Sequence, residues 1–112
     1  MELARRIVDE IADMKGDDIL LLDIRDVTIL ADYFVLGTAV SKRQTKAMVD
    51  GILQATKEDF DTRPWRVEGE AESGWILIDY GDVVVHLFAP EARAYYDLEG
   101  FWKDAKVVVR ML

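Results

Sequence analysis

The stretch from Trp75 to Phe88 constrains the fold more than any other part of the chain. It holds two apolar runs, WILID and VVVHLF, on either side of a short Tyr-Gly-Asp turn. Successive side chains of a strand point to opposite faces, and here apolar residues occupy both faces of both runs. A hairpin without a polar face has to be covered on both sides, at least in part. The chain is therefore expected to build a sheet with protein on each face.

Three helices are predicted around this hairpin. Apolar residues at spacings of three and four predict an amphipathic helix over 3–14. Ser41 with Gln44 matches the capping box that begins a helix, and a long helix over about 42–59 should follow. A last helix is predicted over about 91–98, since a proline suits its first turn.

Three further strands are predicted: an apolar run over 18–24, a run rich in β-forming residues over 33–40, and the segment WRVEGE over 65–70. The order of elements is then α-β-β-α-β-β-β-α. Strands separated by helices can pair in parallel, whereas the hairpin must be antiparallel. The predicted fold is α/β, a single domain with a mixed five-stranded sheet packed with helices.

Length and composition bound the class of protein. The 112 residues fit one domain, which we place at residues 1–102, followed by a C-terminal tail at 103–112. There is no cysteine, so disulfides, thiolate metal sites and cysteine nucleophiles are excluded. No apolar run approaches the roughly 20 residues of a membrane span, and the first helix lacks the apolar core of a signal peptide. We expect a cytoplasmic protein that does not bind membranes.

The charge balance narrows the choice of partner. With 22 acidic and 14 basic residues, the net charge is −8. Phosphate backbones repel such a domain, so DNA or RNA is disfavoured as its primary ligand. The same charge favours encounter with a basic protein.

Two interpretations of the hairpin stay open. In the first, both faces are core and His86, the only histidine of the chain, has its hydrogen bonds satisfied there. In the second, one face is an exposed apolar platform that binds a partner. Trp75 is then the natural anchor, because tryptophan is enriched at binding hot spots.

Acidic and hydroxyl residues do not form a convincing catalytic or metal site. Turn chemistry accounts for Asp79 and Asp82 on either side of Gly81, and one histidine with two aspartates is a weak ligand set. N-capping accounts for Ser41, although a helix N-terminus also attracts anions. Acid pairs at spacing two are the remaining magnesium candidates, and the glutamates among them suit a solvated strand end: Asp59/Asp61, Glu68/Glu70 and Glu70/Glu72.

The chain resembles the Iojap family, the ribosomal silencing factor S group. The resemblance runs from the first helix to about Trp102. It rests on DILLLDI, on ADYFVLGTAVSKRQTKAMVDGI and on VEGEAESGWILIDYGDVVVHLFAPEARAYYDLEGFW. The run WILIDYGDVVVH followed by RAYYDLE is its most specific part. One departure is Gln44, which stands where the family often has a histidine.

The resemblance implies a fold related to nucleotidyltransferases without their chemistry, and so no catalytic residue, metal or cofactor. It implies a cytoplasmic translation repressor that binds the large ribosomal subunit through ribosomal protein L-fourteen. Bound there, it is expected to block joining of the small subunit and to lower protein synthesis when nutrients are scarce. Family members commonly form homodimers. The partner-binding residues are then expected on the hairpin: Trp75, Leu77, Asp79, Tyr80, Asp82 and His86.

Two alternatives from other classes remain. A reduced nucleotidyltransferase would need a Gly-Ser motif followed closely by two carboxylates that hold Mg²⁺. Here Gly37-Thr38 leads into Ala39-Val40-Ser41, and the nearest acid pair, Asp59 with Asp61, lies beyond a whole helix. A scaffold protein that only dimerises through its sheet is the other alternative.

Overall fold

The helices α1 and α2 form where the apolar spacing predicts them. In the computed structural model, which describes residues 1–112, α1 (Glu2–Asp13) buries one apolar stripe: Ala4, Ile7, Val8 and Ile11. α2 (Lys42–Phe60) begins at Ser41, whose Oγ accepts a hydrogen bond from the Gln44 N–H (3.0 Å). The Gln44 side chain accepts from the Val40 N–H (2.7 Å), one residue earlier than in a capping box. The predicted start of α2 is confirmed, with the reciprocal bond shifted by one residue.

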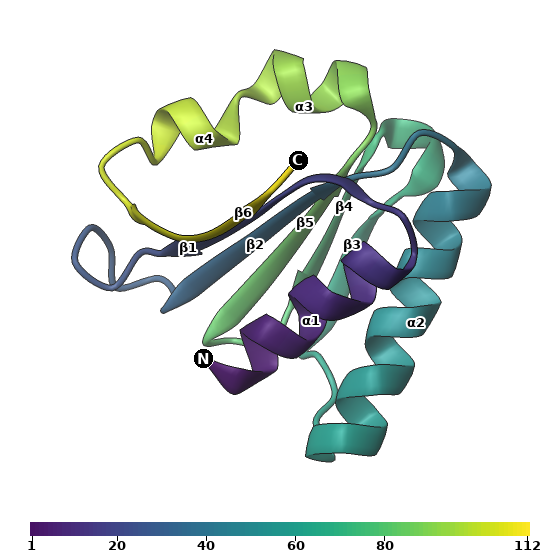
Figure 1. Ribbon diagram of the computed structural model, residues 1–112, viewed down its shortest axis with the longest axis horizontal. Helices are drawn as coiled ribbons and strands as arrows, with labels where there is room; N and C mark the ends of the chain where they lie inside the picture. The colour runs from purple at the N-terminus through teal and green to yellow at the C-terminus, as the bar shows by residue number, and fades with distance from the viewer.

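Six strands form one mixed sheet (Figure 1): β1 (Asp17–Asp23), β2 (Tyr33–Thr38), β3 (Arg66–Glu70), β4 (Trp75–Asp79), β5 (Val83–Phe88) and β6 (Lys106–Met111). Their order across the sheet is β3-β4-β5-β2-β1-β6. β2 and β5 are parallel, and every other neighbouring pair is antiparallel. A parallel pair needs a long crossover, which α2 and the β3–β4 hairpin supply. The predicted α/β class with a mixed sheet is confirmed.

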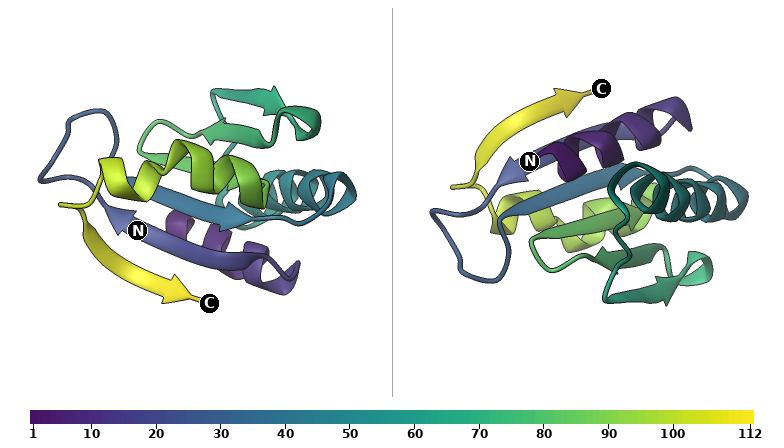
Figure 2. Two further views of the ribbon diagram at one scale, coloured as in Figure 1. Left: turned by 90° about the horizontal axis from the view of Figure 1, so that it is seen from above. Right: turned by 90° about the horizontal axis from the view of Figure 1, so that it is seen from below.

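Helices cover both faces of the sheet (Figure 2). α1 and α2 pack on one face and enclose the larger core, to which β1, β2, β4 and β5 contribute. α3 (Pro90–Tyr96) and α4 (Leu98–Phe101) lie on the other face over a smaller core built on β1, β2 and the end of β5. Each buried Leu, Ile or Val contributes about 1.5–3 kcal/mol, so the α1–α2 side supplies most of the stability. None of the helices is long and apolar enough to cross a membrane.

The strand count differs from the sequence prediction by one. Residues 106–111, which fall in the predicted C-terminal tail, form β6 and pair antiparallel with β1. The pairing carries a register shift between Leu21 and Leu22, and Val108 and Val109 pack against the larger core. The sheet therefore has six strands, because these valines find their apolar partners only through a strand distant in sequence.

The last predicted helix is divided in two. α3 ends at Tyr96, and Asp97 takes a left-handed conformation (φ 45°) before α4 begins. The Asp97 carboxylate accepts a hydrogen bond from the Gly100 N–H (3.2 Å). Aspartate tolerates this conformation and caps helix N-termini well, which explains why the chain breaks and restarts here.

The two faces of the β4–β5 hairpin are distinct. Ile76 and Ile78 of β4 and Val85 and Leu87 of β5 are buried against α1 and α2. Trp75 of β4 and the end of β5 turn toward α3 and α4. The expectation that both faces are covered is therefore only partly met, since β4 alternates between buried and half-buried positions. The half-buried side is where a site can lie.

Candidate docking surface

One side of the β4–β5 hairpin is left partly uncovered. α3 and α4 lie across the middle of the sheet and do not extend over the β3–β4 hairpin beside them (Figure 2). Two adjoining cavities, of about 280 and 230 Å³, lie on this side and share Leu77. We call this surface the open face, and these residues line it: Leu30, Ala31, Phe34, Trp65, Arg66, Glu68, Gly69, Trp75, Leu77, Asp79, Gly81, Val84 and His86.

An aromatic group forms the covered end of the open face. The half-buried Trp75 ring lies 4.7 Å from Tyr96 of α3 and 5.0 Å from Phe88 of β5, between ring centroids. His86 packs edge-on against Phe34 at 4.8 Å. Such pairs contribute about 0.5–1.5 kcal/mol each beyond the area that they bury. Trp75 is therefore packed on one side by these rings and remains partly exposed on the other.

Trp75 and His86 are joined by a hydrogen bond. The indole Nε1–H donates to His86 Nδ1 at 3.2 Å. Burial lowers the pKa of His86 to about 4, although the nearby negative charge of Asp79 opposes this shift. The imidazole is therefore neutral at physiological pH and is held in one orientation. A group that titrates near pH 4 is poorly suited to general acid or base catalysis at neutral pH.

Asp79 belongs to the turn and to an ion pair. Its Oδ1 accepts from the Gly81 N–H (2.7 Å), and its Oδ2 accepts from Arg66 Nε (3.3 Å). Gly81 has φ +89°, where a side chain would be strained and would meet the Trp65 ring at about 3.0 Å. This close approach seats Trp65 over the turn, with 80% of its surface exposed. Asp82 is exposed at the end of the same turn.

The sequence of the chain is similar to that of known proteins of one family. A family model described as "Ribosomal silencing factor during starvation" matches residues 1–111. The chain belongs to the ribosomal silencing factor family. A silencing factor from Halalkalibacterium halodurans is 35% identical over 96% of this chain and 91% of its own length. A mouse relative named for mitochondrial assembly of the ribosomal large subunit is 33% identical over 76% of this chain and 38% of its own.

A solved structure supports the same relationship. The crystal structure of a Chromobacterium violaceum protein matches with a TM-score of 0.85 at 35% identity, over 91% of this chain and 84% of that protein. The match confirms the fold class of this family member. The family description names ribosomal silencing during starvation. This family member thus has a role in ribosome-associated silencing of translation.

The structure brings together most, but not all, of the predicted binding residues of this silencing factor. Trp75, Leu77, Asp79 and His86 lie on the open face. Tyr80 lies on the opposite face, where its hydroxyl is 2.9 Å from Thr56 Oγ1 of α2 and burial raises its pKa. Its side chain contributes to the core and is not available on the open face.

Most residues of the open face were not among the predicted binding residues, and Trp65, Leu30 and Arg66 are the largest exposed ones. Trp65 and Leu30, 80% and 75% exposed, come from loops before β3 and β2, and Arg66 begins β3. The available signal was a large apolar residue in a polar loop, as in TILAD and TRPW. Surface apolar residues are common, however, and only their convergence in space gives these a meaning.

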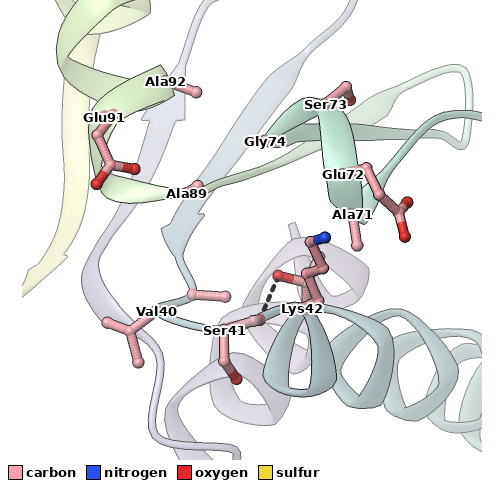
Figure 3. A pocket seen from close by; sticks show the side chains of 12 residues that line it. Val40, Ser41, Lys42, Ala71, Glu72, Ser73, Gly74, Ala89, Glu91 and Ala92 are labelled. Carbon is pink, nitrogen blue, oxygen red and sulfur yellow. Dashed lines mark hydrogen bonds between the residues drawn. The ribbon is translucent and has the colours of Figure 1, made fainter.

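A further pocket lies where α2 and α3 begin. It measures about 310 Å³ and is lined by residues of α2, α3 and the short 3₁₀ helix η1 (Ala71–Ser73). Lys42 points toward η1, which carries Glu72, and Glu91 lies across the pocket on α3 (Figure 3). Two carboxylates against one ammonium make this a poor phosphate site, and Ser41 is already engaged as the cap of α2.

The acid pairs considered for magnesium are used elsewhere or exposed. Asp59 accepts a hydrogen bond from Arg6 of α1 (2.8 Å), and Asp61 caps the end of α2. Glu68 and Glu70 are exposed on β3, where Arg66 contacts Glu68 at 3.1 Å. No three histidine, cysteine or acidic side chains converge closely enough to hold a metal ion.

Proposed function

We propose that this silencing factor represses translation by binding the large ribosomal subunit through ribosomal protein L-fourteen. The bound factor occupies the surface of L-fourteen that the small subunit would contact, so that the two subunits do not join. Protein synthesis then falls when nutrients are limited. We propose the cytoplasm as the compartment in which this occurs.

The open face is the observation that carries this proposal. It is an apolar and aromatic surface with two adjoining cavities, left uncovered beside α3 and α4. Exposed patches of this kind mark protein-binding sites, and half-buried tryptophan is a typical anchor. The family assignment and the mouse relative, which is named for assembly of the ribosomal large subunit, indicate which particle supplies the partner.

The charge of the chain supports a basic protein partner. The net charge is −8, exposed Glu68 of β3 lines the open face, and exposed Glu70 follows two residues further along the same strand. A partner with basic residues around an apolar segment would be attracted to these carboxylates and discriminated from acidic proteins. Bare ribosomal RNA would be repelled by the same charges.

We further propose that the free protein forms a homodimer. β6 is an edge strand, and its outer backbone groups have no strand to pair with. Val107 and Leu112 are exposed there. A second copy could satisfy this edge by antiparallel pairing. A scaffold protein that only dimerises would share this property, so ribosome binding is what separates the two hypotheses.

None of the contacts around Ser41 or the acids beyond α2 favours the nucleotidyltransferase alternative. The small-residue strand end at Gly37 leads directly into Ser41, which is engaged by Gln44. The acids beyond α2 pair with Arg6 or cap the helix. Turnover of nucleotide by the purified protein with Mg²⁺, above the background of a mock preparation, would nevertheless restore it.

Co-sedimentation with isolated large subunits tests the proposed function. The wild-type protein is expected to pellet with large subunits, not with small subunits, and to reduce formation of complete ribosomes when both are mixed. Lys46→Ala, on the exposed side of α2 away from the open face, should behave as wild type. Absence of co-sedimentation at micromolar concentration would contradict the proposal.

A further inference from the structure

The open face contains a buried polar atom without a partner, His86 Nε2. The His86 side chain is only 4% exposed, yet it helps to line the cavity of about 280 Å³. Buried donors and acceptors without a hydrogen bond are rare in native proteins, because leaving one unpaired is unfavourable. An orphaned atom at such a cavity is a position where a bound group can supply the missing bond.

The hydrogen bond from Trp75 decides what kind of atom Nε2 is. An indole Nε1–H can only donate, so His86 Nδ1 must be an acceptor and carries no proton. A neutral imidazole has one ring proton, which must then sit on Nε2. Burial favours the neutral form, since it lowers the pKa of His86 to about 4. The orphaned atom is therefore a donor, an N–H group.

The groups that surround His86 leave this donor unpaired. Phe34 and Phe88 contribute aromatic rings, and Leu77 lies opposite on β4. Asp79 is the nearby carboxylate; its oxygens accept from Gly81 and Arg66, and it forms no hydrogen bond with His86 Nε2. The chain thus places one hydrogen-bond donor in an otherwise apolar surrounding.

We propose that His86 Nε2–H donates a hydrogen bond to a carbonyl oxygen of the protein segment that docks on the open face. This inference rests on the proposed function and specifies the chemistry that its partner must present. The segment brings apolar side chains for the cavity and a neutral oxygen for His86. A carboxylate is disfavoured at this position, because Asp79 and the overall charge of −8 would repel it.

Trp75 is then a positioning residue as well as an apolar anchor. Its indole N–H selects the imidazole tautomer that presents a donor to the partner. A phenylalanine at position 75 would keep an aromatic ring beside Phe88 and Tyr96 but would lose this selection. Orientation of a histidine by a second hydrogen bond is a common way of defining which of its nitrogens acts.

The tautomer can be measured directly, because the chain has a single histidine. Nitrogen NMR of protein labelled with ¹⁵N-histidine should give one imidazole, with Nδ1 unprotonated and Nε2 protonated at pH 7. Trp75→Phe should give a mixture of the two tautomers. A wild-type Nε2 without a proton would overturn the proposal, whatever the protein does on the ribosome.

Binding variants test the role toward the partner. His86→Asn keeps an oxygen near Nδ1 for Trp75 but lacks the outer N–H, whereas His86→Gln can return an amide N–H to the outer position. Affinity for isolated large subunits should fall about five- to tenfold for His86→Asn, as expected for loss of one hydrogen bond, and by no more than about twofold for His86→Gln. Equal losses in both variants, or none in His86→Asn, would overturn the proposal.

A third experiment needs no variant: purified L-fourteen is added to the labelled wild-type protein, and the Nε2 proton of His86 is observed. The Nε2 proton should shift and exchange more slowly with water in the complex. An unchanged resonance at saturation would overturn the donor role while leaving binding itself intact. If L-fourteen and large subunits do not bind at all, the proposed function fails and the donor loses its partner, a result distinct from an unprotonated Nε2.

Discussion

Arg93 Nη1 of α3 donates a hydrogen bond to Thr38 Oγ1 of β2 (2.8 Å), and only 7% of the Arg93 surface is exposed. The same guanidinium contacts the main-chain carbonyl and the carboxylate of Asp18 in β1. Its Nε donates to Glu99 of α4 at 3.3 Å. One buried cation thus joins both helices of the covered side to two strands, and it holds α3 and α4 beside the open face.

Replacement of Arg93 by alanine should therefore destabilise the whole domain. Loss of the guanidinium removes its hydrogen bonds to Thr38 and to the Asp18 carbonyl, and each hydrogen bond to a charged group typically contributes about 1.5–3 kcal/mol. The carboxylates of Asp18 and Glu99, which are 35% and 31% exposed, add less because water can solvate them. Urea unfolding would measure this. Arg110→Ala is the matched control, because Arg110 contacts the same Asp18 from an exposed position and should contribute less than about 1 kcal/mol. Equal effects of the two variants would contradict this structural role of Arg93.

Trp75→Ala should weaken binding to large subunits more than it weakens the fold. Loss of a hot-spot anchor costs roughly 2 kcal/mol or more of binding, about thirtyfold in affinity. The ring also contacts Phe88 and Tyr96, so some stability is lost with it. A fully buried tryptophan would cost about 3–5 kcal/mol. Melting and affinity are measured together, and a collapsed melt would mean that Trp75 is a core residue.

Asp79→Asn should weaken binding in a salt-dependent way. The substitution removes one negative charge that faces a basic partner, and it releases Arg66, while an asparagine oxygen can still accept from the Gly81 N–H. Titration with large subunits at low and high salt should show the loss shrinking as salt rises. Glu58→Gln on α2 makes the same change in charge away from the open face and should have little effect. A loss independent of salt would contradict the electrostatic role.

Protonation of His86 should make stability fall between neutral and mildly acidic pH. Its pKa is about 4 in the folded protein and 6.5 in the unfolded chain, so the unfolded state binds more protons in this window. The contribution of neutral His86 to the free energy of unfolding is complete above about pH 6.5. It falls by roughly 1.4 kcal/mol per pH unit as the pH drops toward 4. Urea unfolding at pH 7 and pH 5 should differ by about 2 kcal/mol. The His86→Asn variant should lack most of this difference, and an equal slope in both would point to another group.

The homodimer should depend on the β6 edge. Light scattering of the free protein at micromolar concentration should report a dimer, and Val107→Lys should shift it toward monomer, since a charge on an edge strand opposes pairing. Val107 is 53% exposed, so this change should leave the melting temperature nearly unaltered. Val67→Lys on β3, at the opposite edge of the sheet, is the matched control. A monomeric wild type throughout this range would contradict the dimer.

The local features of the fold were predictable from the sequence alone. The spacing of apolar residues in α1, the cap at Ser41 and the apolar runs of β4 and β5 are all features of residues close in the chain. Helix caps and strand alternation depend on backbone geometry within a few residues, which any fold must respect. The family could be recognised for a related reason, because its motifs are contiguous runs.

Contacts between distant segments were decided only by the tertiary structure. Val108 and Val109 become an edge strand because β1 is there to pair with them, and Tyr80 turns to Thr56 rather than to the open face because α2 covers that side. Trp65 reaches the open face through Gly81, whose missing side chain leaves room for its ring. Arg93 is buried because two strands and a helix supply its partners from positions up to 75 residues away in the chain. Alternation assigns Trp75 and His86 to a face, but whether that face is core or docking surface depends on how far α3 and α4 extend over it, and packing sets that distance.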